Sequence, residues 1–157
     1  MSRATIRRAR MADLEPLVQL ERLFPSDNLS RRSFRHLLTR AHADVWVCVR
    51  AERMIGNAVV LYRAGSRSAR LYSVVIDPAE RGRGIARDLV KRAHDAARRR
   101  CCTQLHLEVR PDNTAAIRLY RKLGYRETRR IARFYEDGAD ALRFEATLAA
   151  RRRAHTR

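Results

Sequence analysis

The stretch LYSVVIDPAERGRGIARDLVKRAHDAA, residues 71–97, decides the fold. It opens with an apolar run, Leu71–Ile76, which predicts a buried strand that ends at the turn residues Asp77-Pro78. A basic loop with two glycines, Arg81–Gly84, follows. Apolar residues then recur at steps of three and four between Ile85 and Ala97, which predicts an amphipathic helix. The stretch therefore predicts a strand, a glycine loop and a helix in succession.

The glycine loop has the features of an anion site. The start of a helix presents unpaired backbone N–H groups and a partial positive charge. Gly82 and Gly84 let the backbone approach a ligand closely, while Arg81, Arg83 and Arg87 add full positive charge. Such a site suits a phosphate or pyrophosphate. The loop lacks the Gly-Lys-Ser/Thr of a P-loop, and its glycine spacing does not fit a dinucleotide fingerprint.

The loop is similar to the Arg/Gln-x-x-Gly-x-Gly/Ala pattern of the GNAT N-acetyltransferases, as Arg81-Gly82-Arg83-Gly84-Ile85-Ala86. This resemblance implies that the loop binds the pyrophosphate of acetyl-CoA. It also implies that the central strand and the next strand splay apart. The pantetheine arm would then bond to the exposed strand edge at Val74, Val75 and Ile76. A plain strand-to-helix turn is the alternative interpretation.

The rest of the chain predicts alternating elements around this centre. Periodicity and turn residues predict strands at 5–9, 44–50, 54–63, 103–109, 125–131 and 141–148, and helices at 12–22, 31–40 and 114–123. This order predicts a mixed, mostly antiparallel sheet of about seven strands with helices on both faces. It is also the order of the GNAT fold, an α/β (α+β) architecture, and the resemblance adds the splayed strands that form the acetyl-CoA cleft.

Length and composition predict one domain over residues 1–150 and a basic, frayed tail at 151–157. No apolar run approaches the ~20 residues that span a bilayer, and the basic N-terminus lacks the apolar region of a signal peptide. These features predict a cytoplasmic protein with no membrane contact. The three cysteines show no metal-ligand spacing, which predicts reduced thiols and no metal site.

The net charge of +18 is the unusual feature of the composition. Only two of the 35 basic residues are lysines, and the basic residues are scattered along the chain. The simplest interpretation is an arginine-rich solvated surface. The alternative is attraction to the anionic cofactor, to acidic substrates, or to nucleic acid or ribosomes.

A second motif, LEVRPDNTAAIRLYRKLGYRE at residues 107–127, resembles the ribosomal-protein alanine N-acetyltransferases of the RimI type. The resemblance implies that Glu108 is the general base, that Tyr120 is the general acid, and that Asn113 contacts the cofactor. Each has a simpler alternative: a solvent-facing carboxylate paired with an arginine, a packed tyrosine, and a helix cap. His106 is a weaker candidate for a proton relay, and Tyr135 for lining the acceptor slot.

These roles match the chemistry of acetyl transfer to an amine. The amine must lose a proton, which a carboxylate accepts, and the leaving thiolate must gain one, which a phenol donates. A strand-edge N–H at Val75 is a suitable donor to the developing oxyanion. The resemblance implies acetyl-CoA as donor and a peptide or protein N-terminal α-amine as acceptor, and a monomer or a homodimer is expected. A small-molecule amine acceptor, a basic RNA-binding protein on the same fold and a CoA-sensing module are the alternatives.

Overall fold

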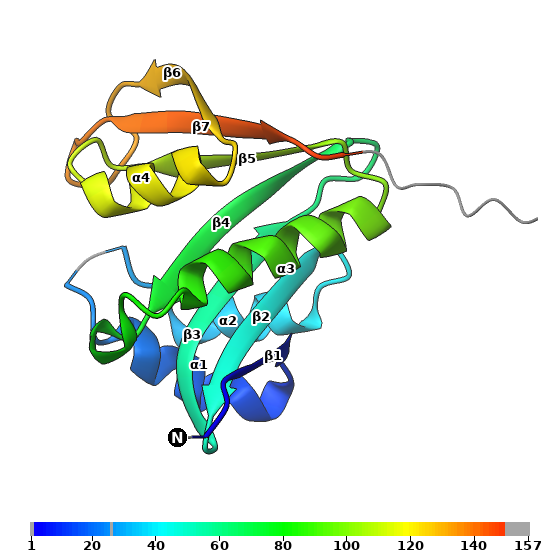
Figure 1. The fold of residues 1–157 in the computed structure, drawn as a ribbon, viewed down its shortest axis with the longest axis vertical. Helices are drawn as coiled ribbons and strands as arrows, with labels where there is room; N and C mark the ends of the chain where they lie inside the picture. The colour runs from blue at the N-terminus through cyan, green and yellow to red at the C-terminus, as the bar shows by residue number, and fades with distance from the viewer. Residues whose placement is uncertain (1, 26, 150–157) are drawn as a thin grey trace, which may run out of the picture.

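A seven-stranded sheet organises the molecule, in the strand order β1-β2-β3-β4-β5-β7-β6 (Figure 1). The structure is a computed structural model that describes residues 2–25 and 27–149, so the predicted tail at 151–157 lies outside the described residues. The β4–β5 pair is parallel and the other pairs are antiparallel, which confirms the predicted mixed sheet. The strands are β1 (Thr5–Arg8), β2 (Ala43–Arg50), β3 (Arg53–Leu61), β4 (Ser68–Ile76), β5 (Gln104–Val109), β6 (Arg126–Ile131) and β7 (Ala141–Thr147).

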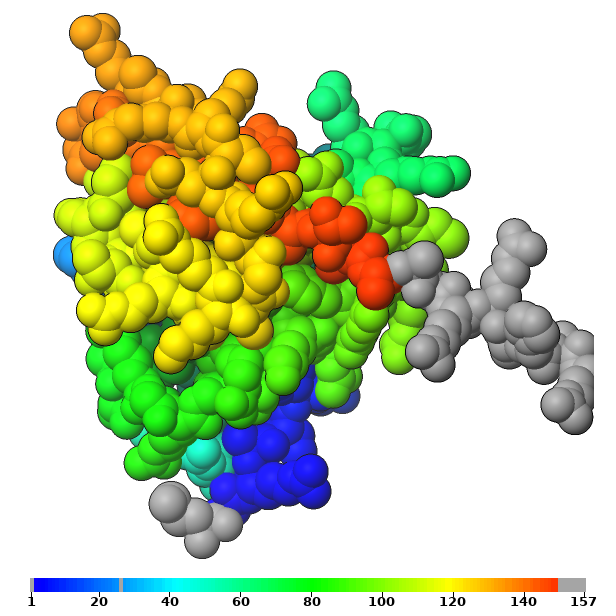
Figure 2. Space-filling view, turned by 45° about the horizontal axis from the view of Figure 1, so that its top comes forward, coloured from blue at the N-terminus to red at the C-terminus, as the bar shows by residue number. Residues whose placement is uncertain are grey.

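Helices cover both faces of the sheet, as predicted. The helices α1 (Leu14–Glu21) and α2 (Arg31–Thr39) pack on one face, in a core with β2 and β3. On the other face α3 (Ile85–Arg99) and α4 (Thr114–Lys122) share a larger core with β4, β5 and β7. Figure 2 shows α4 in yellow lying beside α3 in green and β6 in orange. No helix within the described residues is both long and apolar enough to cross a membrane.

Local sequence signals set the ends of several elements. The Ser30 hydroxyl accepts from the backbone N–H of Ser33 at 3.1 Å and caps α2, while Gly124, at φ 92°, ends α4. Two predicted starts are wrong by two residues or more. The helix predicted from residue 12 begins as a 3₁₀ turn, Met11–Asp13, and β4 begins at Ser68 rather than Leu71. The strand starts early because Ala69 is fully buried where β4 pairs with β5.

The parallel pairing of β4 with β5 is short, and this opens the sheet. Only Ser68–Arg70 of β4 pairs with β5, opposite Gln104–His106. Beyond that point β4 remains paired with β3, and β5 with β7, as the two strands diverge (Figure 1). The edge of β4 from Leu71 to Ile76 therefore has no strand partner on its β5 side within the described residues. The structure thus contains the splayed pair that was expected.

Candidate active site

The glycine loop lies where β4 ends and α3 begins. Gly82 and Gly84 have φ values of 80° and 78°, in the left-handed region that favours glycine. Gly84 is the N-cap of the 15-residue α3 and provides no side chain to cap it. A Cβ atom built on Gly82 would meet nothing within 4 Å, so the loop is open on that side. The first N–H groups of α3 are therefore available to an anion.

The arginines of this loop differ in what they contact. Arg83 donates to Glu80 at 3.2 Å and Arg87 to Asp88 at 3.3 Å. The Arg81 guanidinium lies 5.9 Å from the centroid of the Phe24 ring and has no carboxylate partner within the described residues. Arg81 is thus the cation of the loop that is free to pair with a ligand. The side chain of Ile85 is buried in the core, so only its backbone can serve a ligand, and Ala86 is half-buried beside it.

The residues predicted to form the strand edge lie at the end of β4, just before this loop in the chain. Val74, Val75 and Ile76 pair with β3 on one side, opposite Ala58, Asn57 and Gly56. Their other backbone edge faces the gap between β4 and β5. An open strand edge that leads to an uncapped helix start fits an extended ligand with a diphosphate at one end, as in acetyl-CoA. When bound, acetyl-CoA would supply a thioester as the acyl donor.

Glu108 extends from β5 on the sheet face opposite α3. It forms an ion pair, as the alternative interpretation expected, but its side chain is only 8% exposed rather than solvent-facing. Arg70 Nε donates to Glu108 Oε2 at 2.9 Å from the neighbouring β4. Its Oε1 has no hydrogen-bond partner in the described part of the chain, so it is free to accept a proton. His106 bonds instead to Ser68 Oγ at 3.0 Å, and burial lowers its pKa.

Tyr120 lies on α4, packed against the core. Its ring meets that of Tyr125 edge-on with 5.5 Å between centroids, and burial raises its pKa to about 12. The charge of Tyr135 adds to that rise, while burial and the charge of Glu108 raise the pKa of Tyr135 itself. The centroid of the Tyr135 ring itself lies 4.1 Å from the Arg110 guanidinium. Asn113 Oδ1 accepts from the N–H of Ala116 at 3.2 Å, so it caps α4 and leaves its amide NH₂ for a ligand.

An aromatic and cationic rim around Glu108 was not predicted from the sequence. The Arg70 guanidinium lies 5.0 Å from the centroid of the Tyr72 ring and 5.9 Å from that of Phe134. Both rings are partly exposed, and Phe134 meets Tyr135 edge-on at 5.0 Å. Strand alternation places Arg70 and Tyr72 on one face, which was readable from the sequence. The contact of Arg70 with Phe134 of the β6–β7 loop could not be predicted from the sequence, because it depends on tertiary structure.

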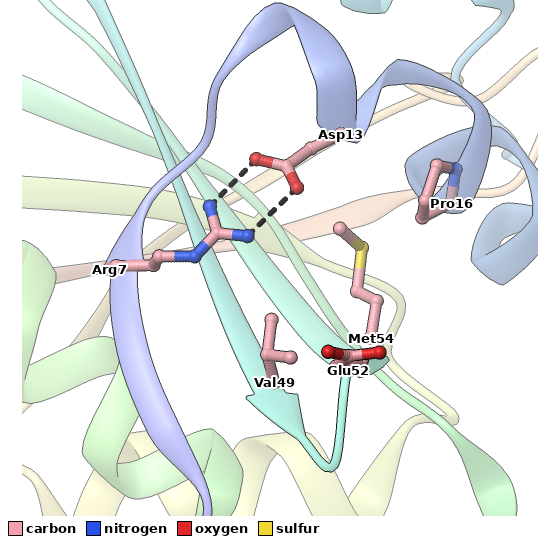
Figure 3. A pocket seen from close by; sticks show the side chains of 6 residues that line it. All are labelled: Arg7, Asp13, Pro16, Val49, Glu52 and Met54. Carbon is pink, nitrogen blue, oxygen red and sulfur yellow. Dashed lines mark hydrogen bonds and ion pairs between the residues drawn. The ribbon is translucent and has the colours of Figure 1, made fainter.

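A separate hollow lies at the other end of the sheet, between β1, the start of α1 and the β2–β3 turn (Figure 3). Arg7 bonds to both carboxylate oxygens of Asp13 there, at 2.7 and 2.9 Å. The hollow shares no residue with the predicted site. No group of three or more His, Cys, Asp or Glu side chains within the described residues is placed to hold a metal ion.

A family model for the GNAT acetyltransferases matches residues 11–125. The chain belongs to the GNAT acetyltransferase family. Among curated relatives, the N-alpha-acetyltransferase RimI of Mycobacterium tuberculosis is 38% identical over 94 residues, which cover 55% of this chain and 58% of the relative. N-alpha-acetyltransferase 30 of Schizosaccharomyces pombe is 27% identical over 134 residues, which cover 83% of this chain and 89% of the relative. Streptothricin acetyltransferase of Streptomyces lavendulae is 34% identical over 68% of this chain and 57% of the relative.

Solved structures confirm the GNAT fold. The ribosomal-protein-S18-alanine N-acetyltransferase of Escherichia coli superposes with a TM-score of 0.84, at 23% identity and with 99% of each chain covered. A chain of the NatC complex bound to Gag peptide and CoA superposes at 0.83, with 22% identity and 95% and 100% coverage. The family match and the N-alpha-acetyltransferase relatives show that this GNAT protein is an acyltransferase, and its resemblance to RimI-type proteins, expected from the sequence, is confirmed.

Proposed function

We propose that this GNAT protein transfers acetyl from acetyl-CoA to the N-terminal α-amine of a peptide or protein. Relatives named as N-alpha-acetyltransferases support the acceptor class, and the CoA-bound structural neighbour supports the donor. The single observation that carries the mechanism is the nearly buried Glu108, with one oxygen held by Arg70 and the other free. The cytoplasmic location expected from the sequence stays a prediction.

In this proposal Glu108 accepts the proton of the acceptor amine, directly or through a water molecule. Arg70 fixes the orientation of the carboxylate, because a charge-assisted hydrogen bond from Nε restricts its rotation. Tyr120 holds its proton at neutral pH, since burial raises its pKa to about 12. It therefore donates to the sulfur that leaves during transfer. The N–H groups of the open β4 edge, Val75 among them, stabilise negative charge on the acyl oxygen.

The cofactor contacts follow from the loop and the strand edge. The backbone of Gly82, Gly84 and the first turn of α3 would bind the diphosphate, with Arg81 as its counter-charge. Arg83 contributes a weaker field because Glu80 already pairs with it. Val74 to Ile76 would bind the pantetheine arm through backbone groups, and Asn113 through its amide.

A small-molecule amine is the second candidate acceptor. The streptothricin acetyltransferase relative, 34% identical over 68% of this chain, favours it. The net charge of +18 opposes it, because a small molecule that carries several protonated amines would be repelled. Thiol release from acetyl-CoA with a panel of N-terminal peptides and small amines decides between them. Turnover confined to small amines would refute the peptide proposal.

The catalytic roles are tested in the same assay. Glu108→Gln is expected to lower kcat/KM by about 10²–10⁴, and Tyr120→Phe to lower kcat, since each removes one proton-transfer group. Glu145→Gln is the matched control: it lies on the same sheet face and pairs with Arg143 at 3.1 Å, yet has no proposed role. Unchanged turnover across pH in both test variants would remove the assignment.

A further inference from the structure

Arg110 lies at the open end of the split sheet. The parallel strands β4 and β5 pair at their beginnings and diverge toward their ends, and Arg110 directly follows the last residue of β5. Its Nε and Nη2 donate to the two carboxylate oxygens of Asp27 at 2.9 and 3.1 Å. Asp27 lies between α1 and α2, which pack on the N-terminal part of the sheet. This ion pair therefore joins the two parts of the sheet where strand pairing has ended.

The same guanidinium holds a second loop. Arg110 Nη1 donates to Asp137 Oδ2 at 2.9 Å, and the guanidinium lies 4.1 Å from the centroid of the Tyr135 ring. Asp137 and Tyr135 both belong to the connection between β6 and β7. Asp137 is itself fixed by the N–H of Ala139 at 3.0 Å, which with Arg110 lowers its pKa. One planar fork thus bonds two carboxylates on two loops, a geometry that a lysine ammonium does not reproduce.

Among the described residues, the other hydrogen bonds of the α1–α2 loop are local to that loop and the helix ends beside it. Glu21 Oε2 accepts from the N–H of Leu29 at 3.1 Å, and Asn28 donates to the carbonyl of Phe24 at 3.1 Å. Asp27 has a left-handed backbone, with φ 60°, and its side chain extends from this turn to Arg110. The Arg110 pairs are the ionic links between the two loops within the described residues.

We propose that Arg110 is a positioning residue that closes the open end of the split sheet and sets the acceptor slot. Arg110 follows the end of β5 two residues after Glu108, so continued strand alternation places both on the same face about 7 Å apart. Closure by Arg110 fixes Tyr135 and the α1–α2 loop near Glu108, the carboxylate that accepts the proton of the amine in the proposed mechanism. The naming of this space as the acceptor slot rests on the proposed function, whereas the closure is a property of the fold alone.

Hydrogen exchange of the full-length chain tests the closure without any activity. Arg110→Met removes both ion pairs and keeps the aliphatic stem, so exchange in peptides spanning 20–30 and 132–140 is expected to accelerate about tenfold. Arg130→Met is the matched control, because it removes an arginine–aspartate pair at the base of the second loop, with Asp140 at 2.7 Å. In Arg130→Met, hydrogen exchange of peptides spanning 20–30 should be unchanged. Unchanged exchange of 20–30 in Arg110→Met would overturn the closure.

Steady-state kinetics with an acceptor peptide that has no charged side chains test the slot. We expect Arg110→Met to raise the acceptor KM about tenfold, with kcat and the acetyl-CoA KM within about twofold. The acceptor KM of Arg110→Lys should lie between those of the native enzyme and Arg110→Met. Asp27→Asn should raise the KM of the native enzyme but not of Arg110→Met, because the partner is already lost. Faster loop exchange with an unchanged acceptor KM would refute the positioning role. A native chain without transferase activity would refute the proposed function, while exchange still decides the closure.

Discussion

Burial determines the protonation state of the Tyr120 hydroxyl. The side chain is packed in the core between α4 and the sheet, and its pKa rises to about 12 because the charged phenolate would lose its hydration there. The unfolded chain binds this proton less tightly, with a pKa near 10. The folded state therefore holds the proton through the pH range in which the unfolded state releases it.

This difference predicts a specific alkaline destabilisation. As pH rises from about 10 to about 12, the folded state should lose on the order of 2–3 kcal/mol from Tyr120. Tyr120→Phe has no phenol to ionise, so its free energy of unfolding should fall less over that range. Urea unfolding at pH 8 and pH 11 checks this. An equal fall in both proteins would contradict it.

Arg70 is the residue on which the orientation of Glu108 depends. Arg70→Met should lower kcat about 10- to 100-fold, because the carboxylate loses its charge-assisted hydrogen bond. Arg143→Met is the control, since Arg143 pairs with Glu145 on the same sheet face at 3.1 Å. Steady-state kinetics of the two variants would differ in kcat. A similar kcat for both would indicate that the Arg70 pair is only structural.

At the scale of elements, the start of α3 depends on a glycine that few other residues could replace. Gly84→Ala should weaken CoA binding about tenfold, because the left-handed φ is strained for alanine and its Cβ would lie 2.8 Å from Arg87. Gly65→Ala is the control: it has φ 75°, nothing within 4 Å of its Cβ, and lies in the β3–β4 loop. Calorimetric titration with CoA separates the two. Equal CoA affinities would contradict the loop assignment.

Elements with a local signal were predictable from the sequence. The 3.6-residue period of α3, the alternation of β5 and the caps Ser30 and Asn113 each act within a few residues, and all four features are present in the structure. The glycine loop was also readable, because its spacing is contiguous. The partners of Glu108 and Arg110 could not be predicted from the sequence, because Arg70, Asp27 and Asp137 come from three other segments. Such contacts depend on how the two parts of the sheet meet.

At the scale of the whole molecule, the positive charge is less uniform than its scatter along the sequence suggests. Many arginines in the N-terminal part pair with acids, as Arg50 does with Glu80 and Arg100 with the buried Asp44. The segment from residue 118 to 133 instead contains seven basic residues and a single acidic residue, Glu127. Among them Arg118, Arg121, Lys122 and Arg126 are exposed and have no carboxylate partner within the described residues.

This surface predicts where contact with nucleic acid would occur. Changing Arg121, Lys122 and Arg126 to Glu should weaken binding of single-stranded RNA at least tenfold and flatten its salt dependence. The same changes at Arg32, Arg35 and Arg40 alter the net charge equally but lie on or just after α2. Fluorescence anisotropy across a salt series compares them. Equal loss in both variants would show that only the net charge matters.

The short pairing between β4 and β5 has a consequence for how the protein persists in a cell. Three residues of each strand join the two parts of the sheet, and the coenzyme arm would take the position of a missing strand along the rest. A ligand that completes the backbone bonding of a sheet is part of its tertiary structure as well as its substrate. Because binding to the folded state alone adds stability in proportion to the logarithm of ligand concentration, acetyl-CoA supply would govern the lifetime of the enzyme as well as its rate.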